Sequence, residues 1–407
     1  MPVFDVAIAG GGAAGLSLGA ALKQALGAGA SVAVVDPAPA PARESAEPPL
    51  RTVAIAEGPR RLFERIGAWE AIQPKAQPIL MMDVMDGGVR DAVRLPHLHF
   101  DRRSDGEPLA HMAFNDEIVR VLSALCERLG VARLAASVAG WRPGKHVAEL
   151  SLSDGSAIRA RLAVAADGQR SKLRTLAEIQ TIGWDYDQSG LVATIAHERD
   201  HEGRAEQHFL PAGPFAILPL PGRQSSIVWN ERSAEARALL ALDARDLLRE
   251  LELRFTPKLG EIRLASRVEA FPFRFQIARR FVGQRLALVG DAAHLVHPLA
   301  GQGLNLGLRD VAAIAETIVG EMRLGLDPGA PAPLGSYERA RRFDIAASGM
   351  GMDAMNRLFS NDVAPLRFLR DLGLRLVNRT PPLKDLLILE ARGAGRGVPK
   401  LLRGLSL

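Results

Sequence analysis

Six residues near the N-terminus, Gly10-Gly11-Gly12-Ala13-Ala14-Gly15, have the types and spacing of a phosphate-binding turn. They follow an apolar run, 3–9, and open a stretch of strong helix formers, so the turn is predicted between a strand and a helix. There the first glycine makes the tight turn, the second lets the backbone approach a pyrophosphate, and the third permits close helix–strand packing. The dipole and free N–H groups at the helix start favour the same anion. The candidate contacts are Gly10, Gly12, Ala13, Ala14 and Gly15.

An acidic residue, Asp36, ends the next buried strand predicted by the sequence, 31–35, and lies 21 residues after Gly15. A carboxylate at this position can accept hydrogen bonds from ribose hydroxyls and disfavours a 2′-phosphate. We therefore expect the ADP part of FAD or NAD to bind here. For the glycine motif alone, a turn without a ligand is the plain alternative.

A second constellation, far downstream, favours FAD over NAD. The predicted strand 286–289 is followed directly by Gly290 and Asp291, and a glycine-bearing loop, 297–305, then feeds a helix. A strand-end aspartate can bind polyol hydroxyls such as a ribityl chain. Backbone amides of Gly303 and Leu304 at the helix start can face a ring edge that gains negative charge on reduction. Taken alone the pattern is weak, because Gly-Asp before a helix is also a common turn and cap.

The run from Ala287 to Asp310 closely resembles the signature of the ubiquinone-biosynthesis hydroxylases, within the class A flavoprotein monooxygenases typified by p-hydroxybenzoate hydroxylase. The resemblance implies that Gly290 and Asp291 contact the flavin ribityl chain. It also implies that a flavin-side loop lies beside the isoalloxazine ring, formed by Pro298, Gly303, Leu304 and Asn305.

Further family positions lie elsewhere in the chain. Asp167 and Gly168, in the run 166–171, resemble a motif that serves both the FAD pyrophosphate and the nicotinamide donor; a simple β-turn is the alternative. Arg51 and Asn115 match flavin-side positions, and a helix cap explains Asn115 equally well. Asp36 stands where these hydroxylases more often have Glu, which serves a ribose equally well.

The resemblance implies an enzyme with bound FAD that uses NAD(P)H and O2 to hydroxylate the aromatic ring of a polyprenyl phenol in ubiquinone biosynthesis. No catalytic triad or metal-ligand spacing stands out, so we assign no catalytic side chain and expect no metal; the cofactor carries the chemistry. We expect the hydrophobic phenol to lie against the middle sheet, around Phe209, Phe215, Leu218 and Pro219, although each also fits a core position. The ring position and the choice of NADH or NADPH stay open.

Other functions remain as alternatives. They are a hydroxylase of small phenols, a flavin halogenase, a prenyl reductase and a non-catalytic dinucleotide-fold binding protein. The sequence 184–187 does not supply the W-x-W-x-I-P motif of a tryptophan-type halogenase. A binding protein would keep the first glycines without needing the motif at 290–305.

The sequence predicts an α/β fold, α+β overall. Nucleotide-binding α/β segments flank a β-rich middle, and these segments position the motif residues. We predict a Rossmann-like FAD-binding domain from residues 1–76, 108–180 and 275–340. A β-sheet substrate domain, 77–107 and 181–274, is inserted into it, and C-terminal helices occupy 341–407. Within this scheme 234–254 is expected as one helix, 304–322 as a long helix and 328–333 as a proline-rich linker.

Charge is concentrated at the C-terminus. Residues 363–407 carry nine Lys and Arg against three acids, whereas the whole chain of 407 residues has a net charge of only +5. Without a basic groove or recognition motif, this excess gives no reason to expect nucleic acid. Leucines at 366, 369, 372 and 376 share one arc with Val377, opposite the arginines. We expect these helices to dock on an anionic membrane surface or a membrane-associated ubiquinone-biosynthesis complex, and packing on the flavin domain is the alternative.

The expected location is cytoplasmic, with peripheral attachment to the inner face of the membrane left open. The N-terminus lacks the basic leader of a signal peptide, and no apolar run reaches the ~18–20 residues of a spanning helix. The single cysteine, Cys126, excludes an intrachain disulfide and is expected to be a buried, inert thiol.

Overall fold

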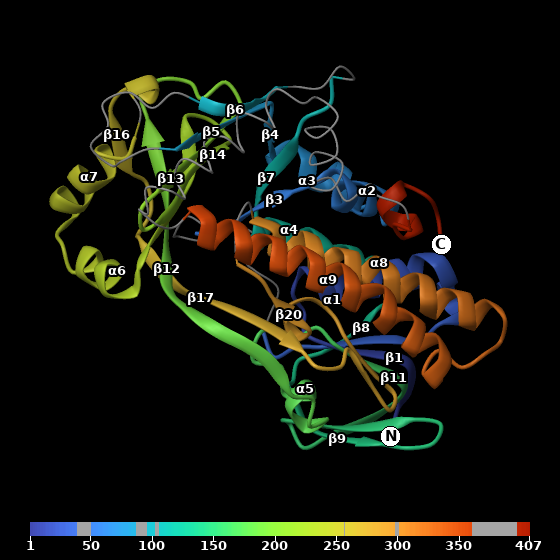
Figure 1. Ribbon diagram of the computed structural model, residues 1–407. Coiled ribbons are helices and arrows are strands. Elements are labelled where there is room, and N and C mark those ends of the chain that lie inside the picture. The colour runs from blue at the N-terminus through green and yellow to red at the C-terminus, as the bar shows by residue number, and fades with distance from the viewer. Residues whose placement is uncertain (39–49, 87–95, 102–105, 256, 298–300, 360–396) are drawn as a thin grey trace.

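The computed structural model describes residues 1–38, 50–86, 96–101, 106–255, 257–297, 301–359 and 397–407. Two lobes, each built around one large β-sheet and its own apolar core, make up the molecule (Figure 1). We call the lobe that contains the N-terminal strand the first lobe and the other the second lobe. The α/β fold class predicted from the sequence is confirmed.

The first lobe has an eight-stranded sheet in the order β18-β19-β11-β1-β2-β8, with β10 and β9 continuing from β11. Its strands are β1 Val3–Ala9, β2 Val32–Val35, β8 Ala132–Leu134, β9 Val138–Pro143, β10 Ala148–Leu152, β11 Ala157–Ala165, β18 Val282–Gly283 and β19 Leu286–Leu288. The strands β19, β11, β1, β2 and β8 run parallel. Four of these five, all but β8, are largely buried, as expected for a parallel sheet covered on both faces.

The carboxyl ends of four parallel strands lie side by side. Ala9 of β1 pairs with Val35 of β2 and with Ala165 of β11, and Ala165 pairs with Leu288 of β19. The glycine turn, Asp36, the 166–171 motif and the 290–291 pair each follow one of these strand ends. The four sequence motifs therefore emerge at one edge of the sheet, where open α/β sheets bind their ligands.

Helices cover the first lobe, and α1 packs between α4 and α8. The helices are α1 Ala13–Leu26, α2 Glu57–Arg65, α3 Trp69–Ile72, α4 Asn115–Arg128, α5 Lys172–Leu176, α8 Gln302–Arg323 and α9 Pro331–Phe359, with short 3₁₀ turns η1 Gly27–Gly29, η2 Gln73–Lys75, η4 Gly290–Ala292 and η6 Lys400–Arg403. The C-terminal η6 lies against α2 and α8 (Figure 1). A small sheet, ordered β3-β7-β4, lies between the lobes and comprises β3 Thr52–Ile55, β7 Ala110–Phe114 and β4 Gln77–Ile79.

The second lobe has a nine-stranded sheet in the order β20-β17-β12-β15-β14-β13-β5-β6, with β16 paired to β12. Its strands are β5 Met81–Asp86, β6 Pro96–Phe100, β12 Thr181–His197, β13 Arg204–Leu210, β14 Gly213–Leu220, β15 Gln224–Arg232, β16 Ile262–Leu264, β17 Glu269–Ala278 and β20 His294–Leu295. The helices α6 Ser233–Leu240 and α7 Ala244–Glu252 and the turn η3 Pro257–Leu259 complete the lobe.

The two faces of this sheet have different neighbours. Side chains of Leu191, Phe215 and Trp229 pack with α6 and α7 in the core of the second lobe, and we call this side the outer face. Residues that alternate with them point the other way. On that inner face Thr52 Oγ1 of the first lobe lies 2.9 Å from Ser226 Oγ. Figure 1 shows α6 and α7 on the side of the sheet away from α9 and the first lobe.

Two elements differ from the sequence prediction. Residues 234–254 form two helices, because the side chain of Asp243 caps a new helix by accepting a hydrogen bond from the Asp246 amide. The expected linker 328–333 is shorter, since α9 already begins at Pro331, where proline's missing N–H would have no helical partner in any case. Helix α9 also continues across residue 340, so the boundary proposed there falls inside a helix.

The predicted leucine arc, 366–377, lies outside the described residues. Within the described parts of the chain, no helix is long and apolar enough to cross a membrane. Cys126 is buried, and burial raises the pKa of its thiol to about 11, which fits the inert role expected from the sequence.

Candidate cofactor and substrate site

The glycine turn after β1 is shaped by close backbone contacts on one side and open space on the other. Gly10 has φ +111°, and a Cβ there would lie 2.2 Å from the carbonyl oxygen of Ala166. A Cβ on Gly15 would lie 2.0 Å from the carbonyl oxygen of Gly10. In contrast, no atom lies within 4 Å of a Cβ built on Gly12, the N-cap of α1. A phosphate can therefore approach the N–H groups of α1 at this point.

Asp36 is tied to this turn directly. Its Oδ2 accepts a hydrogen bond from the amide of Gly11 at 2.5 Å, and its Oδ1 accepts one from Ala38 at 2.8 Å. A carboxylate has about four acceptor sites, so both oxygens retain capacity for a ribose hydroxyl. The carboxylate is half-buried and lies beside the glycine turn, as the ribose of a bound dinucleotide requires.

Asp167 follows β11 and has one oxygen without a partner. Its Oδ2 accepts hydrogen bonds from the amides of Lys172 and Leu173, the first two residues of α5, at 2.7 and 3.3 Å. Its Oδ1 is buried and has no hydrogen-bond partner in the described structure. Gly168 has φ +79°, so the motif does form a turn. The turn alternative and a ligand-binding role are thus compatible, because the turn leaves a carboxylate oxygen unused.

Asp291 lies in η4, directly after β19, and its side chain is exposed. Even so, desolvation by the surrounding protein raises its pKa, a shift that electrostatic interactions with His294 and Arg51 only partly offset. The carboxyl group is therefore accessible to solvent and at the same time surrounded by protein atoms, as in a recess. Gly290, with φ +58°, approaches Ala14 and Gly307 to 3.8 Å at its Cβ position, so η4 lies against the starts of both α1 and α8.

A buried ionic hub holds η4 in place. Asp310 of α8 is fully buried; its Oδ2 accepts a hydrogen bond from the Gly290 amide at 2.9 Å and lies 2.6 Å from His294 Nε2. Its Oδ1 accepts one from Arg341 Nε of α9 at 2.7 Å. Burial alone would raise the pKa of Asp310, but His294 and Arg341 outweigh it and lower the pKa.

Two more side chains support the same turn from outside. The hydroxyl of Tyr337 donates to the carbonyl of Leu288 at 2.7 Å, and Arg174 Nη1 donates to the carbonyl of Ala292 at 2.8 Å. Asp310, Arg341 and Tyr337 support the site, although none of the sequence motifs indicates them. An acid inside the apolar helical run 304–322 was the available signal for Asp310, whereas nothing local marks two residues that act from a distant helix.

The first turn of α8 is fastened to β3 by Asn305. Its Oδ1 accepts a hydrogen bond from the Ala56 amide at 3.0 Å, and its Nδ2 donates to the carbonyls of Ala54 and Gly301 at 2.8 and 3.3 Å. The Asn305 side chain is therefore occupied by backbone groups and positions the loop. Gly303 and Leu304 lie in the same turn, and no atom lies within 4 Å of a Cβ built on Gly303. Pro298 lies outside the described residues.

Arg51 and Asn115 meet where β3 begins. The amide of Asn115 donates to the carbonyl of Arg51 at 2.9 Å, and the Arg51 guanidinium lies 4.9 Å from the centroid of the Phe271 ring on β17. Asn115 is the first residue of α4 and the N-cap is Phe114, so the helix-cap alternative for Asn115 is wrong. Arg51 is exposed and joins the first lobe to the inner face of the second.

His297, just before the flavin-side loop, is a buried histidine without hydrogen bonds. It is fully buried, and neither ring nitrogen has a partner in the described structure. Its ring contacts Tyr186 and Phe273 edge-on, with centroids 5.0 and 4.9 Å away. Burial lowers its pKa to about 4, so the imidazole is neutral at physiological pH. The described residues contain no cluster of three or more His, Cys, Asp or Glu that could hold a metal.

Comparison with known proteins places this geometry in a family. Residues 3–346 match the sequence profile of the family described as FAD binding domain. The chain is 44% identical to ubiquinone hydroxylase UbiL of Rhodospirillum rubrum over 100% of its length and 94% of that protein. It is 34% identical to 3-demethoxyubiquinol 3-hydroxylase of Escherichia coli, over 93% of the chain and 96% of that protein. The chain belongs to the FAD-dependent ubiquinone-biosynthesis hydroxylases.

A solved structure supports the fold of this flavoprotein. The p-nitrophenol 4-monooxygenase PnpA of Pseudomonas putida superposes with a TM-score of 0.79 at 18% identity, covering 98% of this chain and 100% of that one. FAD is thus the cofactor, and the residues present fit it. Open space faces α1 at Gly12, Asp167 has an unused buried oxygen, and Asp291 is accessible within η4.

The sequence placed the substrate of this hydroxylase around four residues of the middle sheet, and the structure separates them. Phe209 and Leu218 point to the inner face, toward the first lobe. Phe215 is fully buried on the outer face, packed against Trp229 with ring centroids 6.3 Å apart, and Pro219 alternates to the same side. The expectation was therefore wrong for Phe215 and Pro219, because strand alternation sends neighbouring residues to opposite faces.

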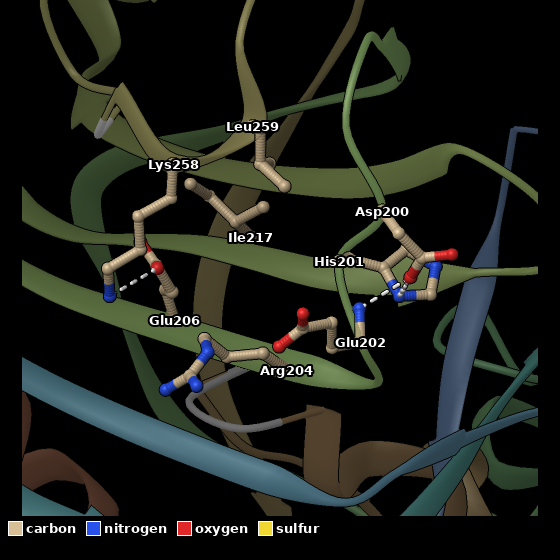
Figure 2. A pocket seen from close by; sticks show the side chains of 8 residues that line it. All are labelled: Asp200, His201, Glu202, Arg204, Glu206, Ile217, Lys258 and Leu259. Atoms are coloured by element: carbon tan, nitrogen blue, oxygen red, sulfur yellow. Dashed lines mark hydrogen bonds and ion pairs between the residues drawn. The ribbon is translucent and has the colours of Figure 1, made fainter.

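A hollow on the outer face is not part of this site. This cavity has a volume of about 290 Å³. Figure 2 shows the side chains that line it: Asp200, His201, Glu202, Arg204, Glu206, Ile217, Lys258 and Leu259. Three of its charged side chains form ion pairs: Lys258 Nζ lies 3.2 Å from Glu206 Oε1, and Arg204 Nη1 lies 2.6 Å from Asp83 Oδ2. A strongly charged hollow on the side away from the first lobe does not suit a hydrophobic phenol.

Proposed function

We propose that this protein hydroxylates the aromatic ring of a polyprenyl phenol in ubiquinone biosynthesis, with NAD(P)H and O2 as co-substrates. The observation that carries the proposal is the 44% identity to ubiquinone hydroxylase UbiL over the whole chain, together with the four motifs that emerge at one sheet edge. When bound, FAD supplies the redox chemistry, in which NAD(P)H is oxidised and O2 gives one oxygen atom to the ring and one to water.

We propose the following roles for the chain's own residues. The open N-terminus of α1 at Gly12 binds the pyrophosphate, and Asp36 binds the adenosine ribose. Asp167, through its unused oxygen, and Asp291, which is accessible within η4, bind hydroxyls of the cofactor. Gly303 and Leu304 present backbone amides to the ring edge, where negative charge on the reduced cofactor is stabilised. Arg51 adds a positive charge on the same side.

The inner face of the second lobe is our proposed wall for the substrate ring. Val192, Val228 and Ala216 lie in one row across β12, β15 and β14 on this face. These side chains are apolar, so they can position a hydrophobic phenol and exclude water from the reacting atoms. His297, neutral and unpaired, lies beside the flavin-side loop and can hold a proton at one ring nitrogen without carrying charge there.

We further propose that the basic C-terminal segment docks the enzyme on an anionic membrane surface. The support is the sequence alone: nine cations against three acids in 363–407, with leucines on one arc. A polyprenylated phenol resides in the bilayer, so docking would bring the active site to it. Each cation near an anionic surface contributes about 1 kcal/mol.

Quinone-intermediate profiling tests the proposed function. In a strain that lacks this protein, mass spectrometry should show less ubiquinone and an accumulated precursor that lacks one ring oxygen. The wild-type gene should restore ubiquinone, and the Asp167→Ala variant should restore little. Normal ubiquinone with no accumulated precursor would refute the assignment to this pathway.

A further inference from the structure

Asn230 of β15 places a buried amide on the inner face of the second lobe, beside apolar side chains such as Val228. Its side chain is 4% exposed, and its Oδ1 is buried without a hydrogen-bond partner in the described structure. Asn230 shares its face with Val228 and Ser226 by strand alternation, and Ser226 is the residue that meets Thr52 of the first lobe. The unpaired amide therefore faces the first lobe, away from the core under α6 and α7.

The neighbours of Asn230 are aromatic. It pairs with Gly190 of β12, which in turn pairs with Phe271 of β17, so the three residues form one row across the sheet. A Cβ on Gly190 would lie 2.4 Å from Cζ of Phe273, which means that the Phe273 ring covers the glycine. The absence of a side chain at Gly190 thus allows an aromatic ring to lie directly beside the amide.

The same row reaches the flavin side of the first lobe. Phe271 is the last residue of this row, and the guanidinium of Arg51 lies over the Phe271 ring. Arg51 directly precedes β3, to which Asn305 fastens the first turn of α8. The amide of Asn230 consequently lies on the part of the inner face that adjoins the proposed ring-binding elements.

Buried polar side chains in folded proteins almost always have hydrogen-bond partners, so an unpaired amide among aromatic rings calls for a functional explanation. A carboxamide offers an acceptor oxygen and two donor hydrogens. An aromatic ligand with an oxygen substituent matches both the apolar side chains around Asn230 and its carboxamide. In a site of this composition, the few polar groups fix the orientation of the ligand.

We propose that Asn230 is the specificity-determining residue that binds the phenolic hydroxyl of the substrate and so orients its ring toward the cofactor. The Oδ1 atom accepts the hydrogen bond from the hydroxyl, while the rings of Phe271 and Phe273 contact the aromatic ring. This inference rests on the proposed function. It deepens that function, because it predicts which substrates are accepted: those with a free hydroxyl in reach of Asn230.

The test compares a short-chain prenylated phenol with its O-methyl ether on the purified holoenzyme. Binding is read from the perturbation of the flavin absorbance, and turnover from kcat/KM with NAD(P)H and O2. The wild type should bind the phenol roughly ten-fold more tightly than the ether, because the ether cannot donate the hydrogen bond. Asn230→Leu should reduce this ratio of affinities to about one, chiefly because the variant binds the phenol more weakly. Its FAD content should be unchanged.

Ser225→Ala is the matched control. Ser225 lies on the same strand but on the outer face, where its Oγ is 3.1 Å from His197 Nε2. This variant should keep the full preference for the phenol. Asn230→Thr, which keeps a hydrogen-bonding group, serves if the leucine variant does not fold, and it should keep part of the preference.

The outcomes separate this inference from the proposed function. A wild type that hydroxylates the phenol but binds phenol and ether equally would overturn the role of Asn230, as would an Asn230→Leu variant with the wild-type ratio. A wild type that neither binds the phenol nor consumes NAD(P)H in its presence would instead refute the proposed function.

Discussion

The buried hub under η4 gives the sharpest test of how the cofactor site is held. We expect Asp310→Asn, which keeps the shape but removes the charge, to destabilise the protein by about 3–5 kcal/mol, the usual effect of breaking a buried ion pair. The size follows from the contacts: Asp310 is fully buried and accepts from both Arg341 and the amide of Gly290. Because Gly290 begins η4, FAD affinity should fall as well.

Urea unfolding of the apoprotein and flavin titration measure the two effects separately. The matched control is Asp344→Asn, since Asp344 also pairs with Arg341 but its side chain is 26% exposed. That change should cost no more than about 1 kcal/mol. In a double-mutant cycle, Asp310→Asn with Arg341→Met should be less destabilising than the sum of the single changes by about 1–3 kcal/mol. A loss below about 1 kcal/mol for Asp310→Asn, with normal FAD affinity, would refute the reasoning.

Two further predictions rest on the structure of the cofactor site, and a third rests on the sequence of the C-terminal segment. Gly12→Ala should abolish most FAD binding without lowering apoprotein stability, because the new Cβ meets no protein atom. Gly10→Ala should lower both FAD binding and apoprotein stability. Equal losses of stability in the two variants, measured by thermal unfolding, would contradict this. Burial lowers the pKa of His297 to about 4. As the pH falls, the His297 side chain is therefore protonated in the unfolded chain before it is protonated in the folded protein. The free energy of unfolding should fall by about 3 kcal/mol between about pH 6.5 and 4. His297→Gln should flatten that part of the urea-unfolding pH profile, and an unchanged profile would mean that the imidazole is not desolvated. Co-sedimentation with anionic vesicles should weaken with salt and on replacing the arginines at 367, 370 and 375 by Gln; binding insensitive to both would argue against docking through that segment.

Local patterns predicted those parts of the fold that local interactions determine. The βαβ unit around the glycine turn was predictable because the two strands are uninterrupted buried runs and the turn requires glycine at Gly10 and Gly15. The α/β class followed from the same reasoning. The break at Asp243 was missed, although Asp followed by Ala-Arg-Asp is a capping signal inside an otherwise helical stretch.

Long-range contacts were beyond the sequence. Nothing near Arg341 or Tyr337 indicates that α9 returns to support η4, since both contacts cross 31 or more positions. The face of each strand in the second lobe could not be assigned either, because β14 is apolar on both faces and lacks an alternating pattern. Phe215 and Phe209 were therefore grouped together, although only one of them faces the first lobe. The roles of the individual cofactor residues stay predictions.

The most direct test of the central claim is oxygen labelling with the purified protein. The yellow holoenzyme, with its released flavin identified as FAD, is supplied with NAD(P)H, a prenylated phenol and ¹⁸O2. We expect one labelled oxygen atom in the ring of the product, and NAD(P)H consumption that matches product formation. A protein that binds no FAD, or one that oxidises NAD(P)H but leaves the ring unlabelled, would contradict the assignment as an aromatic hydroxylase.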